Sequence, residues 1–177
     1  VIVVLDEAYY EYVPEGERAP SVEWIKEYPN LVVSRTFSKA YGLAGLRAGY
    51  AVSHESIADV LNRIRQPFNM NSLSLKAAEV VLDDHAYLQK AVEINAHGMK
   101  QLTDFCEDAG FNYIPSYGNF LTIEVGPDAE KLYDELLHEG VIVRPVAGYE
   151  LPNHLRVSIG LPEENDAFIK AMKKLRG

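Results

Sequence analysis

A lysine, an arginine and two hydroxyl side chains gather in residues 34–47, directly after a short apolar run. That run, residues 31–33, has the composition of a buried strand. A lysine amine can form a Schiff base with a carbonyl once it is deprotonated. Hydroxyl groups and a planar guanidinium bind phosphate oxygens, and arginine can do so through two parallel hydrogen bonds. The stretch therefore suits a ligand with both a phosphate and a reactive carbonyl, and its candidate residues are Thr36, Ser38, Lys39 and Arg47.

An acidic side chain follows a second apolar run near the start of the chain. Residues 1–5 are rich in β-branched side chains, which predicts a strand that is covered on both faces, as in a parallel sheet. Asp6 comes next, and ligands of α/β proteins bind at the carboxyl ends of parallel strands. A strand, an Asp-initiated turn and a packing tyrosine, Tyr9, would explain the same residues without a ligand. Alone, this segment favours the second interpretation; together with the lysine stretch it favours a ligand site.

Two segments of the sequence carry a family resemblance. Residues 32–49, VVSRTFSKAYGLAGLRAG, resemble the Schiff-base lysine segment of fold-type I pyridoxal-phosphate aminotransferases of class I/II. Residues 5–12, LDEAYYEY, resemble the segment that precedes it in the same family. The resemblance extends from Val1 to Arg176 and, within the family, points most to the histidinol-phosphate aminotransferases.

The resemblance implies a role for each candidate near the start of the chain. Lys39 would bind the cofactor, pyridoxal 5'-phosphate, and then act as general base and acid. Asp6 would face the nitrogen of the cofactor ring, and Tyr9 would reach its phenolic oxygen. The residues that would hold the cofactor phosphate are Thr36, Ser38 and Arg47. The alternatives are that Lys39 is an ordinary solvated lysine and that Arg47 is a member of a surface ion pair.

Two arginines near the end of the chain are candidates for binding substrate. Arg156 alternates with apolar residues in LRVSIG, and a charged side chain in such a strand must meet an anion or lie at a sheet edge. By the resemblance, Arg156 grips the α-carboxylate or equivalent end group of the substrate, and Arg144 helps to bind its phosphate. The alternative for both is an intramolecular salt bridge with an acidic residue.

Strand-like and helical patterns alternate along the chain, which predicts an α/β fold. We expect three regions: residues 1–72, the end of the large cofactor-binding domain with its parallel or mixed sheet; residues 73–110, a helical interdomain region; and residues 111–177, a smaller C-terminal α/β domain. Helices are predicted at residues 21–28, 53–65, 73–109 with a break near Asp83, 129–139 and 162–175. Strands are predicted at residues 1–5, 31–35, 48–52, 113–114, 120–125, 141–146 and 155–159.

Composition excludes several classes of function. The chain has 177 residues and a net charge of −9, which argues against nucleic-acid binding. No apolar run reaches membrane-spanning length, and the five histidines show no metal-ligand spacing. The single cysteine, Cys106, excludes an internal disulfide, fits a reducing cytoplasm and is predicted to pack as a small hydrophobic residue.

The predicted activity is transamination between histidinol phosphate and 2-oxoglutarate or glutamate, in histidine biosynthesis, by a cytoplasmic homodimer. Other cofactor contacts of the family lie in a part that would precede Val1, so we expect this chain to be a C-terminal portion with little or no activity alone. One alternative is a pyridoxal-phosphate-dependent decarboxylase of a phosphorylated amino acid. Another is a non-catalytic dimerisation or binding module.

Overall fold

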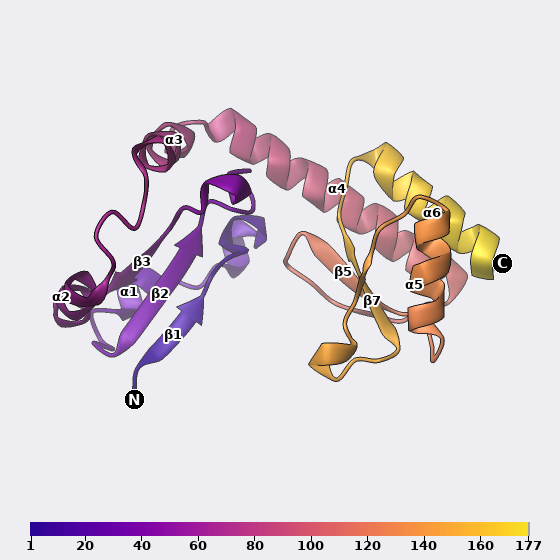
Figure 1. The fold of residues 1–177 in the computed structure, drawn as a ribbon, viewed down its shortest axis with the longest axis horizontal. Coiled ribbons are helices and arrows are strands. Elements are labelled where there is room, and N and C mark those ends of the chain that lie inside the picture. Colours follow the sequence, from indigo (N-terminus) through magenta and orange to yellow (C-terminus); the bar gives the residue numbers. More distant parts are fainter. Residues whose placement is uncertain (177) are drawn as a thin grey trace. The chain divides into compact units, whose positions relative to one another are not determined.

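The structure, a computed structural model, describes residues 1–176. The chain divides into two compact units, the first of residues Val1–Val92 and the second beginning at Glu93. We call them unit 1 and unit 2. The boundary falls within one long helix, α4 (His85–Ala109), which Figure 1 shows as a single uninterrupted coil.

Unit 1 is built on a three-stranded sheet with the order β1 (Val3–Asp6), β2 (Leu31–Thr36) and β3 (Gly49–Ser53). β1 and β2 are parallel, with Asp6 opposite Ser34, whereas β3 runs antiparallel to β2 (Figure 1). The mixed sheet confirms the predicted α/β class. Because β1 and β2 are parallel, the loops that follow them both start at the end of the sheet where the carboxyl ends of these strands lie.

The two longer helices that lie wholly in unit 1 each begin where a polar side chain caps them. The ring nitrogen Nδ1 of His54 accepts from the backbone N–H of Ser56, and Asn71 Oδ1 accepts from the N–H of Ser74. The α-helices are α1 (Ser21–Trp24), α2 (Glu55–Ile64) and α3 (Ser72–Leu82), and 3-10 turns span Tyr10–Tyr12, Glu15–Glu17 and Ala44–Leu46.

Two predictions about unit 1 were wrong. The helix expected at residues 21–28 ends at Trp24, and the residues after it form turns, in which Lys26 N–H donates to the carbonyl of Glu23 and Glu27 N–H to that of Trp24. The first strand was expected to be covered on both faces, yet Val3 and Val4 are 49% and 63% exposed. β1 lies at an edge of the sheet, so part of its apolar surface has no neighbour within unit 1.

Unit 2 carries a four-stranded antiparallel sheet with the order β4-β5-β7-β6. Its elements are β4 (Tyr113–Ile114), β5 (Phe120–Glu124), α5 (Ala129–His138), β6 (Arg144–Pro145), the 3-10 turn Ala147–Tyr149, β7 (His154–Ser158) and α6 (Pro162–Arg176). The strand expected at residues 141–146 forms ladder pairs only at Arg144 and Pro145. Proline has no N–H to donate, which limits the ladder beyond Pro145.

One face of the unit 2 sheet forms a closed core with α4, α5 and α6. Alternate residues of β5 and β7 point into it, among them Leu121, Ile123 and Leu155. Cys106 is buried in the same cluster, as predicted for a small hydrophobic residue, and burial raises the pKa of its thiol to about 11. Side chains at the alternate positions of these strands, Arg156 included, therefore face away from this core.

Within residues 1–176, no helix has the length and apolar character needed to cross a membrane.

Candidate functional site

The parallel pair β1 and β2 brings the candidate site residues of unit 1 together at the carboxyl ends of the two strands. Asp6 is the last residue of β1 and Thr36 the last of β2, so the segments that follow them leave side by side. Lys39 is half-buried, and its Nζ lies 5.3 Å from the centroid of the Tyr9 ring. The lysine amine and the tyrosine from the preceding segment thus face each other.

Asp6 both initiates a turn and leaves one carboxylate oxygen available. Its Oδ1 accepts hydrogen bonds from the N–H of Ala8 (3.1 Å) and from the hydroxyl of Ser34 (3.2 Å). No hydrogen bond to Oδ2 occurs within the described residues. The two interpretations of this residue are therefore compatible, since the turn orients a carboxylate that still has an oxygen to offer a ligand.

Hydroxyl and guanidinium donors meet in the loop after β2. Arg47 Nη1 donates to Ser38 Oγ (3.3 Å) and to the carbonyl of Ala44 (2.9 Å), while Thr36 Oγ1 accepts from the N–H of Ser38 (3.1 Å). No acidic side chain pairs with Arg47 among residues 1–176, so the surface ion-pair alternative does not hold there. Arg47 has a φ of 53°, a left-handed conformation that is uncommon for residues other than glycine. The loop thus presents a cation and a hydroxyl without an anion of its own.

Glycine at two positions lets this loop approach its neighbours. Gly42 has a φ of +71°, and a Cβ there would collide with the hydroxyl of Tyr87. A Cβ on Gly49 would lie 2.9 Å from the carbonyl oxygen of Arg35. At Gly49 the clash is with backbone, so a side chain would push β3 away from β2. At Gly42 a side chain would displace the Tyr87 ring and strain the left-handed backbone.

Sequence reasoning missed a cluster of Arg35, Glu7 and Tyr10, which are sequence neighbours of the candidate residues. Arg35 makes an ion pair with Glu7 (2.9 Å), and its guanidinium lies 3.7 Å from the centroid of the Tyr10 ring. The parallel pairing of β1 and β2 was the one feature that could have predicted this cluster. Once Asp6 is opposite Ser34, the next residue on each strand points to the other face, which brings Glu7 and Arg35 together.

In unit 2 the two candidate arginines are direct cross-strand neighbours. Arg144 of β6 pairs with Arg156 of β7, and Arg156 in turn pairs with Thr122 of β5. The Nε of Arg156 is buried without a hydrogen-bond partner, and its guanidinium lies 5.0 Å from the centroid of the Phe120 ring.

Neither arginine of this pair has a salt bridge within the part of the chain that the structure describes, so the alternative of an intramolecular ion pair does not hold. Like charges directly opposite each other destabilise a sheet. An anion bound between Arg144 and Arg156 would relieve that repulsion and satisfy the buried Nε.

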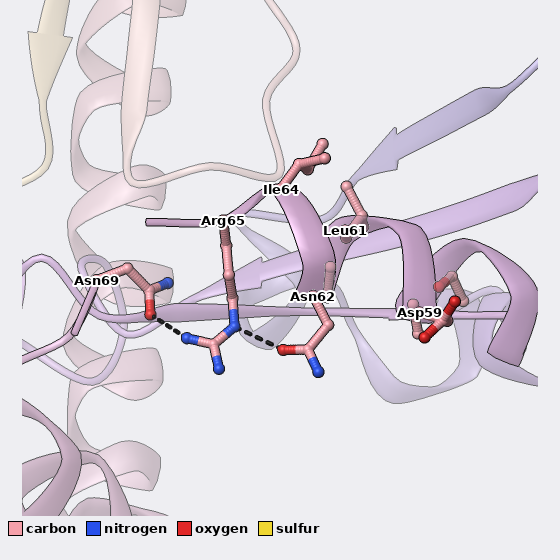
Figure 2. A pocket seen from close by; sticks show the side chains of 9 residues that line it. Asp59, Leu61, Asn62, Ile64, Arg65 and Asn69 are labelled. Carbon is pink, nitrogen blue, oxygen red and sulfur yellow. Dashed lines mark hydrogen bonds between the residues drawn. The ribbon is translucent and has the colours of Figure 1, made fainter. Parts of the chain in front are cut away.

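An open pocket of about 820 Å³ lies elsewhere in unit 1, between β3 and α2 (Figure 2). Arg65 donates there to Asn62 Oδ1 (2.6 Å) and Asn69 Oδ1 (3.0 Å), and Leu61 and Ile64 supply apolar surface. None of the predicted site residues lines this pocket. Residues 1–176 also contain no cluster of three or more side chains that could hold a metal ion.

Comparison with known proteins matches the chain to one family. The family model of aminotransferase class I and II matches residues 1–172. The chain is 92% identical over all 177 residues to histidinol-phosphate aminotransferase 1 of Idiomarina loihiensis, and 58% identical over 175 residues to histidinol-phosphate aminotransferase 2 of Haemophilus influenzae. It spans about half the length of these relatives, 48% in both cases.

Solved structures agree in fold. Histidinol-phosphate aminotransferase from Sinorhizobium meliloti, in complex with pyridoxal-5'-phosphate, has a TM-score of 0.87 and 32% identity over 99% of this chain and 50% of that one. L-threonine-O-3-phosphate decarboxylase from Porphyromonas gingivalis has a TM-score of 0.82 and 25% identity over 97% of this chain and 54% of that one. On the match to its family model and the similarity to these relatives, the chain belongs to the aminotransferase class I and II family.

Proposed function

We propose that this chain supplies the Schiff-base lysine and the substrate-binding arginines of a pyridoxal-phosphate-dependent histidinol-phosphate aminotransferase. The reaction would move an amino group between histidinol phosphate and 2-oxoglutarate, with glutamate as the other amino donor, in histidine biosynthesis. The observation that carries this proposal is the 92% identity, along the whole chain, to a histidinol-phosphate aminotransferase.

The residues of unit 1 fit the cofactor chemically. Arg47 and Ser38 offer a guanidinium and a hydroxyl 3.3 Å apart, which suits a phosphate dianion. Thr36 adds a second hydroxyl beside them. The free oxygen of Asp6 suits a protonated ring nitrogen, and Lys39 Nζ is a primary amine beside an aromatic side chain. When bound, pyridoxal 5'-phosphate supplies an electron sink for the reacting carbon of the substrate.

Lys39, Asp6 and Tyr9 would divide the work at the reacting end. Lys39 Nζ takes the proton from the substrate Cα and later returns a proton, as general base and acid. The Asp6 carboxylate keeps the ring nitrogen positively charged, which strengthens its pull on electrons. Tyr9 lies next to the amine and would donate its hydroxyl hydrogen to the phenolic oxygen of the ring.

Arg144 and Arg156 would bind the anionic end of the substrate. Two guanidinium groups paired across β6 and β7 present more donors than one carboxylate needs, which suits a phosphate as well. The Nε of Arg156 is buried without a hydrogen-bond partner, and an anion bound at this pair would satisfy it. This pair would orient histidinol phosphate and, in the second half-reaction, the carboxylate of glutamate.

In this proposal residues 1–72 form the end of the large cofactor-binding domain, residues 73–110 link it to the small domain, and residues 111–177 make up that small domain. The active form is a cytoplasmic homodimer. The 177-residue chain alone has little or no transaminase activity, because it spans only about half the length of the relatives named above.

The decisive experiment loads the complete natural protein that contains this chain with pyridoxal 5'-phosphate, reduces it with borohydride and maps the labelled residue by mass spectrometry. We expect the label on Lys39, together with formation of glutamate from histidinol phosphate and 2-oxoglutarate. A label on any other lysine would contradict the mechanism. Full biological function in a Lys39→Ala variant would favour the non-catalytic module.

A second candidate function is decarboxylation of a phosphorylated amino acid. The structural similarity to L-threonine-O-3-phosphate decarboxylase supports it, at a TM-score of 0.82. Its substrate also joins an amino acid to a phosphate, so the same lysine and arginines would serve. Release of carbon dioxide without formation of glutamate would identify this activity.

A further inference from the structure

We propose that Arg35 is a positioning residue that holds Asp6 and Tyr9 in place beside Lys39. The inference rests on the proposed function and deepens it. Arg35 itself touches none of the groups that would react. It fastens the segment after β1, which carries Asp6 and Tyr9, to β2, the strand that leads into Lys39.

We call Arg35 and the side chains that it contacts, Glu7, Tyr10 and Tyr50, the clamp. Its first anchor is the ion pair between Arg35 and Glu7. Arg35 Nε and Nη2 both lie 2.9 Å from Glu7 Oε2. The two side chains are only 17% and 9% exposed, so water screens the pair weakly. Glu7 follows Asp6 directly, and its backbone N–H donates to the carbonyl of Ser34 (2.9 Å). The exit of β1 is therefore tied to β2 through both backbone and side chain.

The second anchor is Tyr10, which follows Tyr9 directly. The Arg35 guanidinium lies 3.7 Å from the centroid of its ring, a distance typical of a stacked cation–π contact. Arg18 lies 5.1 Å from the same ring and donates to the carbonyls of Val13 (2.9 Å) and Glu11 (3.0 Å). The 3-10 turn that begins at Tyr10 is thereby held by two arginines.

The third anchor lies on β3. Arg35 pairs across the sheet with Tyr50. Burial lowers the pKa of Arg35, but the Glu7 carboxylate and the Tyr50 side chain outweigh that effect and leave the pKa above its usual value. One planar guanidinium thus joins the exit of β1, the turn after it and β3, while its backbone is part of β2.

The clamp lies next in sequence to two of the site residues, so its loss would affect their positions. Glu7 and Tyr10 are the neighbours of Asp6 and Tyr9, and a loosened anchor moves both of those residues relative to Lys39. Lysine in place of Arg35 would keep the charge. It would lose the two N–H groups that contact Glu7 and the planar guanidinium that stacks on the Tyr10 ring. The charged and titratable side chains around Arg35 are Glu7, Tyr10, Glu11, Arg18, Tyr41 and Tyr50.

The test compares Arg35→Lys and Glu7→Gln with a matched control, Arg63→Lys, in the complete protein that contains this chain. Arg63 makes an exposed ion pair with Asp59 (3.3 Å) in the same unit. Two quantities are measured: hydrogen exchange of the backbone amides of residues 8–13 without cofactor, and the pH midpoint of the visible absorbance change after cofactor is added. Tyr10→Leu serves as a further variant, which decides the matter if Arg35→Lys does not fold.

We expect both clamp variants to speed exchange in residues 8–13 by about tenfold. We also expect the absorbance midpoint to rise by about half a pH unit, because a displaced Tyr9 hydroxyl no longer stabilises negative charge on the ring oxygen. Arg63→Lys should change neither quantity. An unchanged midpoint, even with a lower melting temperature, would reduce Arg35 to a structural role and overturn the inference. Absence of a visible band or of a Lys39 label in the wild type would instead overturn the proposed function, and the positioning role with it.

Discussion

The two units bury their apolar residues very differently. In the described residues, unit 2 has one cluster of fifteen buried hydrophobic residues drawn from α4, α5, α6 and the sheet, whereas the two clusters of unit 1 hold three each. Unit 1 also leaves large apolar side chains exposed on β1 and α2, among them Val4, Val60 and Ile64. Unit 2 is stabilised mainly by its own core, and unit 1 is not.

The difference explains how each unit holds its candidate residues. In unit 2, Arg156 stands on a strand whose other face is packed into the core, so its backbone is fixed by burial. In unit 1, the loop that carries Lys39 packs on the small cluster of Phe37, Ala48 and Ala78. The turn that carries Tyr9 is held by hydrogen bonds and by the Arg35 ion pair. A site built on polar contacts depends on individual side chains more than one built on a large core does.

The strongest test of this comparison removes a fully buried side chain from the unit 2 core. We expect Leu136→Ala to lower the free energy of unfolding of this unit by about 2–5 kcal/mol, because it leaves a cavity in a closed cluster. Chemical denaturation followed by circular dichroism measures the change. A loss below about 1 kcal/mol would mean that unit 2 is packed as loosely as unit 1.

A second test uses the buried carboxyl of unit 1. Burial raises the pKa of Glu11, partly offset by a backbone hydrogen bond and by Arg35 and Arg18. A carboxyl whose pKa is raised in the folded state stabilises it below the unfolded value of 4.5, and that contribution is lost as pH rises through the folded pKa. Glu11→Gln should therefore raise the melting temperature of unit 1 by a few degrees at pH 7.5 and by nothing near pH 4. A variant that melts lower at pH 7.5 would show that the attraction of Arg35 and Arg18 for the Glu11 carboxylate outweighs burial.

A smaller effect is expected at the arginine pair of unit 2. Arg144→Gln removes one of two like charges that face each other across β6 and β7, so it should stabilise this unit by about 0.2–1 kcal/mol. The same variant should weaken the binding of phosphate-bearing substrates by the complete protein. Thermal unfolding without phosphate measures the change in stability, and the shift on adding phosphate measures phosphate binding. A variant that is less stable than the wild type without phosphate would argue against repulsion between the two charges.

The smallest effect is expected on the exposed apolar face of α2. Ile64 is 72% exposed, so Ile64→Ser should change the stability of the isolated chain by no more than about 0.5 kcal/mol. Denaturation of this variant beside Leu136→Ala gives the contrast between the two units directly. A cost similar to that of Leu136→Ala would mean that α2 is covered in solution.

Much of the fold was predictable because its signals are local. Apolar runs and helical periodicity located nearly every element, and Gly110 and Gly140, both at positive φ, lie just after the ends of α4 and α5. Errors arose where pairing decides the structure. Residues 141–146 have strand composition, yet only two of them find a partner strand. Residues 1–5 look like a buried strand, yet β1 lies at an edge of the sheet.

By itself, the sequence was sufficient to identify the family, because the segments around Asp6 and Lys39 carry their pattern within a few adjacent residues. Their roles toward a cofactor remain predictions. Only the tertiary structure set Arg144 opposite Arg156 and fitted Arg35 between Glu7 and Tyr10. Those contacts depend on strand register, and register is decided by the pairing of residues far apart in the chain, which no local pattern encodes.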